Sequence, residues 1–155
     1  MSRPKLTYGI IVFIGILLLV KGLTIAINQV ELIKYSYGFQ LDFSIFMTLL
    51  QRGLFVEIVI IIVSFIGLFI RKNLGYKLLL LFPFFAIGLF FLIGNGFLNS
   101  NWIQLIVPLL IISLTNIRLI RQYFQIETMR SLWRNLSFSL AIGLLIALIF
   151  RLIMI

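Results

Sequence analysis

The stretch that most constrains this chain is the seven-residue segment 71–77, with the sequence Arg-Lys-Asn-Leu-Gly-Tyr-Lys. Three of its residues, Arg71, Lys72 and Lys77, are cationic, and the runs on either side are apolar and too long for the core of a small soluble domain. Charged groups are costly in hydrocarbon, so the segment predicts a turn at a membrane surface. Because basic loops favour the cytoplasmic side, the turn also sets the orientation that we expect for the other segments.

The composition indicates a protein surrounded largely by lipid. Of the 155 residues, 63% are hydrophobic and 11% are charged. Soluble domains are about half apolar and about a quarter charged. A chain with so few polar residues cannot cover a globule in water. We therefore expect an all-α integral membrane protein that forms a single transmembrane helical domain over residues 1–155 and crosses the bilayer five times.

The five expected spans are the long apolar runs of the sequence. The first run follows Arg3 and Lys5 and resembles a secretory signal peptide, but we interpret it as an uncleaved first span. Pro83 and Pro108 lie inside two later runs and are expected to kink their helices. The expected spans are about 7–29, 53–70, 78–97, 102–120 and 136–155.

Two connecting segments carry interfacial signals. Residues 31–52 are mixed, and we expect them to lie at the outer surface. Aromatic or apolar residues alternate with polar or glycine residues over 35–45, but Leu32, Tyr35, Phe39, Phe43, Phe46 and Leu50 also follow helical spacing. Within them, an extended piece near 35–41 is expected to precede an interfacial helix at about 43–51. Residues 121–135 are basic and aromatic, which predicts a short helix on the inner surface that contacts anionic headgroups or the acidic surface of a partner.

Lysine and arginine are shared unevenly between the two sides of this arrangement. With the amino terminus in the cytoplasm, the outer loops hold only Lys34 and Arg52. This bias follows the positive-inside rule and places the carboxyl terminus outside. The net charge of +9 is therefore assigned to topology and anionic headgroups rather than to nucleic acid, because the cations lie at the ends of apolar runs. The nine inner cations are Arg3, Lys5, Arg71, Lys72, Lys77, Arg118, Arg121, Arg130 and Arg134.

Several polar side chains are expected at one depth, in the outer half of the bilayer. Lys21 on the first span and Glu57 on the second are predicted to approach each other, because a pair of opposite charges is tolerated where a lone charge is costly. The alternative is that each side chain extends separately to the headgroups. The polar groups then either line an outward-facing pocket for an anion or lipid headgroup, or form interhelical hydrogen bonds that hold the bundle together. The candidate cluster comprises Lys21, Asn28, Glu57, Asn95, Gln104 and Arg151.

A stripe of small residues marks one face of the fifth span. Ser139, Gly143 and Ala147 recur at intervals of four, so they lie on one side of a helix. Small side chains let two helices approach closely, either within one chain or between chains. The stripe is therefore a candidate helix-packing face.

The residue inventory excludes much catalytic chemistry. The chain contains no histidine and no cysteine, which excludes HExxH zinc proteases, Ser–His hydrolysis, histidine-ligated haem and thiol redox chemistry. Its acids are Glu31, Asp42, Glu57 and Glu127. Only Glu57 is expected within the membrane, so an aspartyl pair is excluded as well. We expect no enzymatic activity, no metal site and no cofactor.

The function expected from these observations is that of a small multi-pass membrane protein that acts through helix contacts. It would serve as an accessory, regulatory or immunity-type subunit of a membrane complex, in the plasma membrane of a bacterium. Its expected partners are the lipid bilayer, anionic headgroups at the basic inner face, and a second copy or another membrane protein. The alternative is a small oligomeric transporter or channel for an ion or small solute. A lipid-handling enzyme subunit is a third and weaker option.

Overall fold

The structure is a computed structural model that describes residues 3–37, 55–93 and 102–154. Within these ranges every regular element is an α-helix. The predicted all-helical class is confirmed for this part of the chain. By length and composition, three helical segments are suited to crossing a membrane: Pro4–Tyr35, Asn73–Leu92 and Met129–Ile153.

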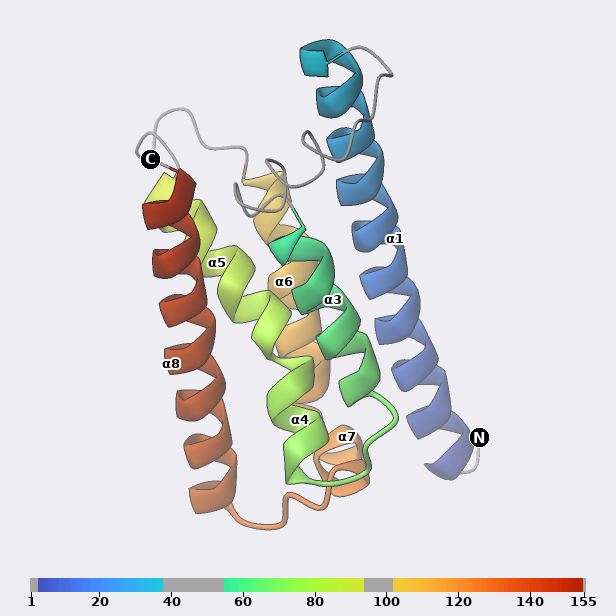
Figure 1. Cartoon of the computed structure of the whole chain (residues 1–155). Helices are drawn as coiled ribbons and strands as arrows, with labels where there is room; N and C mark the ends of the chain where they lie inside the picture. Colours follow the sequence, from blue (N-terminus) through green and yellow to red (C-terminus); the bar gives the residue numbers. More distant parts are fainter. Residues whose placement is uncertain (1–2, 38–54, 94–101, 155) are drawn as a thin grey trace.

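The described helices run along one another in a single bundle (Figure 1). They are, in chain order, α1 (Arg3–Tyr37), α3 (Val56–Gly67), α4 (Asn73–Leu79), α5 (Leu81–Ile93), α6 (Ile103–Thr115), α7 (Arg118–Tyr123) and α8 (Met129–Met154).

The chain passes back and forth along the bundle (Figure 1). α1 runs in one direction and α3 returns; α4 and α5 follow the direction of α1, α6 returns, and α8 runs in the direction of α1 again. The short helix α7 lies at the end where α1 begins. α1 and α8 flank the bundle on opposite sides, with the other long helices between them. α5 packs along α8, whereas α1 packs mainly against α3, α6 and α7.

α1 is longer than the sequence predicted. It contains 35 residues, about 52 Å at about 1.5 Å per residue. Residues 31–37 continue this helix, so the extended piece expected near 35–41 is wrong for its described part, and the rest of 31–52 lies outside the described residues. Glycine and proline are absent between residues 23 and 37, so nothing in the backbone chemistry ends the helix earlier.

The fully buried residues of α1 lie in its first half. Ile14 and Leu18 are fully buried against the bundle. From Ala26 to Tyr35, by contrast, no described side chain is buried, and Tyr35 is 87% exposed. The outer end of α1 also extends beyond the neighbouring helices (Figure 1).

The third apolar run is one bent helix in two parts. α4 ends at Leu79, α5 begins at Leu81, and Leu80 forms the break between them. Pro83 explains the position of the break, because it has no N–H for the carbonyl of Leu79 and its ring crowds that carbonyl. The kink expected at Pro83 is thus present. α6 continues through Pro108 as one helix.

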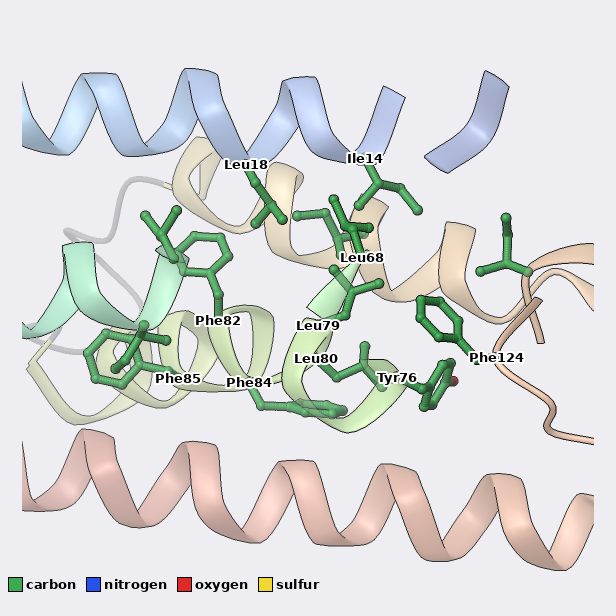
Figure 2. Close-up of a cluster of buried hydrophobic side chains, with 14 of the residues drawn as sticks. Ile14, Leu18, Leu68, Tyr76, Leu79, Leu80, Phe82, Phe84, Phe85 and Phe124 are labelled. Atoms are coloured by element: carbon green, nitrogen blue, oxygen red, sulfur yellow. The ribbon is translucent and has the colours of Figure 1, made fainter. Parts of the chain in front are cut away.

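The core is apolar and rich in aromatic side chains (Figure 2). Tyr76, Phe82, Phe85 and Phe124 are almost fully buried, together with aliphatic side chains from α1, α3 and α6. Two of these rings, Tyr76 and Phe124, meet edge to face with their centroids 5.8 Å apart. Such contacts stabilise a bundle in lipid through packing, because helix association there has no hydrophobic driving force.

Glycines allow the closest approach in the bundle, between α3 and α4. A Cβ atom on Gly67 would lie 2.7 Å from the Gly75 carbonyl oxygen and 2.7 Å from the Leu79 amide nitrogen. A Cβ atom on Gly75 would overlap the carbonyl oxygen of Ile70. The hairpin around the basic turn therefore depends on two residues without side chains.

The segment 121–135 is not one surface helix, contrary to the prediction. α7 ends at Tyr123, a turn follows, and α8 begins at Met129 rather than near 136. Gln125 lies in the left-handed region with a φ of 58°. Its N–H donates to Gln122 O at 3.1 Å, and the Ile126 N–H donates to Arg121 O at 2.9 Å. These two bonds form a Schellman motif, which ends α7 and separates the basic residues into two helices.

Candidate functional site

Lys21 and Glu57 lie on the neighbouring helices α1 and α3. On α1, the neighbouring Gly22 approaches the side chain of Ile61 on α3, one helical turn from Glu57. Both charged side chains are half-buried, and the Lys21 charge acts on the Glu57 carboxylate. Lys21 and Glu57 therefore lie on facing parts of α1 and α3 between apolar side chains, and the pairing of their charges stays a prediction.

The other members of the predicted polar cluster do not gather around this pair. Asn28 and Gln104 are exposed side chains of α1 and α6, and Arg151 is exposed on α8, on the opposite side of the bundle from α1. Asn95 lies outside the described residues. The position of each residue along its expected span predicts its depth in the bilayer, but depth does not give the direction of the side chain around the helix axis.

The small-residue stripe of α8 is occupied within the chain. Ser139 and Ala147 are fully buried, and a Cβ atom on Gly143 would lie 2.8 Å from Phe84 Cβ. The Ser139 hydroxyl lies 3.1 Å from Lys77 O and 2.9 Å from Asn135 O. The stripe therefore packs against α4 and α5, and this face of α8 is not free for a partner.

A hydroxyl from α3 lies in the break between α4 and α5. Ser64 Oγ donates to Leu78 O at 2.9 Å and accepts from the Phe82 N–H at 3.0 Å. In an unbroken helix the Phe82 N–H would itself donate to Leu78 O, four residues earlier. Ser64 is fully buried, so its hydroxyl satisfies two backbone groups that have no water available.

Buried polar residues also connect α4 to α6 and α8. The Tyr76 hydroxyl donates a long hydrogen bond of 3.5 Å to Asn116 Oδ1. Asn135 is fully buried, and its Nδ2 lies 3.4 Å from Asn73 Oδ1. The sequence did not predict the contact between Asn135 and Asn73, because asparagine near a helix end is common and the two residues are 62 positions apart.

The positive charges gather at one end of the bundle, which we call the basic end. The start of α1, the turn between α3 and α4, α7 and the start of α8 all lie there (Figure 1). Glu127 is the acidic residue of this end within the described chain, and Lys34 and Arg151 lie toward the other end. The described cations of the basic end are Lys5, Arg71, Lys72, Lys77, Arg118, Arg121, Arg130 and Arg134, and α1 begins there at Arg3.

Arg71 contacts aromatic side chains of two different helices at the basic end. Its guanidinium carbon lies 5.9 Å from the ring centroid of Tyr8 on α1 and 5.4 Å from that of Tyr123 on α7. Its Nη2 also donates to the Tyr8 hydroxyl at 3.3 Å. Interaction with the Tyr123 hydroxyl, and then with Tyr8, raises the pKa of Arg71 above its ordinary value. The turn residue thus joins two helices through one cationic side chain.

Among the described residues, no three or more histidine, cysteine, aspartate or glutamate side chains lie together in a group that could hold a metal ion. Comparison with known proteins found no matching family model, no matching curated protein and no matching solved structure.

Proposed function

We propose that this chain is a five-span membrane protein with its basic end in the cytoplasm, and that it acts without catalysis as an accessory or regulatory subunit of a membrane complex. A bacterial plasma membrane is the proposed location. Immunity-type proteins, which protect a cell by binding another membrane component, belong to the same class of function.

The observation that carries this proposal is the sorting of charge along the bundle. The chain passes alternate in direction, and the described cations gather at the end where α1 and α8 begin and where α3 and α6 finish. The positive-inside rule favours such an end on the cytoplasmic side. α3 and α6 contain 12 and 13 residues, and both are strongly apolar, so each fits a pass that is completed by flanking residues.

The exposed faces favour action through helix contacts. On α1, large apolar side chains are about half exposed or more along most of the helix, including Val12, Ile16, Leu19 and Leu23. The interior of the bundle is filled by Phe82, Phe85 and other apolar side chains (Figure 2). A filled apolar interior does not favour conduction through a single copy, whereas an apolar exterior suits contact with lipid or with another transmembrane helix.

Topology is tested first, and the chain is suited to the test because it contains no cysteine. Single cysteines at Gln125 and at Ser100 are labelled in intact cells with a membrane-impermeant maleimide. We expect Gln125→Cys to react only after the membrane is permeabilised and Ser100→Cys to react directly. Equal access of both positions from outside would refute the proposed orientation.

The accessory role is tested by crosslinking in the membrane. A photoreactive amino acid at the exposed Ile16 of α1 is expected to yield a defined adduct with another membrane protein, and the same group at the buried Leu18 serves as the control. A homo-oligomeric adduct with a charged path through Lys21 and Glu57 would instead favour the transporter or channel. This alternative is supported by the positions of Lys21 and Glu57 on facing parts of α1 and α3, within apolar surroundings.

A further inference from the structure

We propose that Arg71, Tyr8 and Tyr123 form a binding site for the phosphate group of an anionic phospholipid at the membrane surface of the basic end. This inference rests on the proposed function in one respect, because it takes the basic end to lie at a membrane surface. It adds to that proposal a specific lipid site built by three segments of the chain.

The geometry holds the guanidinium of Arg71 in place. The Tyr8 and Tyr123 rings contact it from α1 and from α7, and the Tyr8 hydroxyl accepts one of its hydrogen bonds at 3.3 Å. The Tyr123 ring is itself fixed, since its hydroxyl donates to Leu68 O at 3.0 Å. An arginine held by aromatic contacts loses less conformational freedom when it binds a ligand than a free surface arginine does.

The held guanidinium keeps donors for a ligand. Arginine has five N–H donors in a planar fork; the Tyr8 hydroxyl takes one of them, the Tyr123 hydroxyl also interacts with the guanidinium, and donors remain after both. The interactions of Arg71 with described residues are with tyrosine side chains, and none is with a carboxylate. Arg71 is exposed at the edge of the bundle, and Tyr8 is half-exposed beside it. The Arg71 guanidinium is positioned by two tyrosines, is exposed and has no acidic partner among the described residues, so its N–H groups can bind the oxygens of a phosphate group.

The surroundings favour a lipid with net negative charge. Lys72 follows Arg71 directly, and Lys5 lies one helical turn before Tyr8 on α1; both are exposed. These cations attract an anionic headgroup and repel the ammonium group of a zwitterionic one. The Tyr8 and Tyr123 rings are also the side-chain type that is enriched at the level of the headgroups.

The test measures lipid binding to the purified full chain. Wild-type protein in nanodiscs or micelles of phosphatidylcholine is titrated with phosphatidylglycerol, and binding is followed by native mass spectrometry and by thermal stabilisation. We expect Arg71→Lys to weaken phosphatidylglycerol binding about five-fold, because it keeps the charge and loses the fork. Arg134→Lys, at an exposed position of the same basic end, is the matched control and should leave binding unchanged.

Several results would overturn the site. Equal binding by wild type and Arg71→Lys, or an equal loss in Arg134→Lys, would reduce the effect to general attraction between charges. Inorganic phosphate that displaces the lipid at comparable concentration would assign the site to a free anion instead. Should Arg71→Lys fail to fold, Tyr8→Phe removes only the hydroxyl that accepts from Arg71, and it is expected to weaken binding in the same direction.

The lipid test and the topology test fail separately. Binding in detergent does not depend on which side of the membrane the basic end faces. Reversed cysteine labelling with selective lipid binding intact would therefore refute the orientation alone. Correct labelling with no effect of Arg71→Lys would refute the lipid site alone.

Discussion

Replacing Ser64 by alanine tests the most unusual contact of the bundle. The change removes one hydroxyl that donates to Leu78 O at 2.9 Å and accepts from the Phe82 N–H at 3.0 Å. Alanine keeps the Cβ atom, so packing of α3 is hardly altered. What is lost is the partner of two backbone groups in the break between α4 and α5.

The expected loss of stability follows from these two bonds. A buried intramolecular hydrogen bond contributes about 1 kcal/mol in soluble proteins, and bonds between transmembrane helices average about 0.6 kcal/mol. Two such bonds give about 1–2 kcal/mol for Ser64→Ala. The Phe82 N–H lies four residues after Leu78 O, so straightening of the helix can restore one bond and hold the loss within this range.

The measurement is reversible unfolding of purified protein in mixed micelles with increasing sodium dodecyl sulfate, followed by far-ultraviolet circular dichroism. Ser113→Ala is the matched control, because the Ser113 hydroxyl donates to Leu109 O within its own helix and is exposed. We expect that control to change the unfolding free energy by less than about 0.5 kcal/mol. If Ser64→Ala and Ser113→Ala unfold alike, the hydroxyl in the helix break contributes nothing measurable and the reasoning is wrong.

Three further predictions use the same unfolding measurement. Gly75→Ala should cost more than about 3 kcal/mol or prevent folding, because the new Cβ atom overlaps a backbone carbonyl. The control Gly9→Ala places its Cβ atom where nothing lies within 4 Å, and it should be neutral or stabilising. Equal effects of the two changes would contradict the close approach of the chain around Gly75. Gln125→Gly should stabilise by about 1 kcal/mol, because glycine adopts the left-handed conformation without strain; a loss would show that the side chain matters more than the backbone. Glu57→Gln should lower the unfolding free energy by about 1 kcal/mol, and adding Lys21→Met should restore part of this loss, because the unpaired cation is then removed. Purely additive losses would show that the two charges do not interact.

Much of the helical organisation was predictable from single runs of the sequence. Apolar length identified the membrane-length helices, and the basic segment 71–77 marked the hairpin between α3 and α4. The predicted turn is shorter than expected, because only Arg71 and Lys72 of this segment lie in the connection and the residues from Asn73 onward belong to α4. Pro83 located the break within the third run because its effect on the backbone is local and depends on no distant partner. The number of spans and the side on which each terminus lies stay predictions.

The errors arose where two local signals competed. Residues 31–37 carry both an alternating pattern and helical spacing, and the helix of α1 continued because no residue there interrupts it. Residues 121–135 appeared as one basic segment, yet the left-handed residue Gln125 divides them. A non-glycine residue rarely adopts this conformation, so the sequence gives little warning of such a turn.

The polar contacts of the interior were least accessible to prediction. Ser64 stood out only as a residue on one face of its helix, and its partners are 14 and 18 residues away in the chain. Pairing of Asn135 with Asn73 spans 62 residues. Helical periodicity gives the face of a residue but not the neighbouring helix that the face meets, so these bonds required the assembled bundle.

The uneven burial along α1 has a consequence for its motion. Its inner portion is fixed by Ile14 and Leu18, whereas no described side chain from Ala26 to Tyr35 is buried. Backbone amides of one uninterrupted helix should therefore exchange with deuterium at graded rates, slowest near Leu18 and faster toward Tyr35, because local opening of the last turns disrupts less packing than opening near Leu18 does.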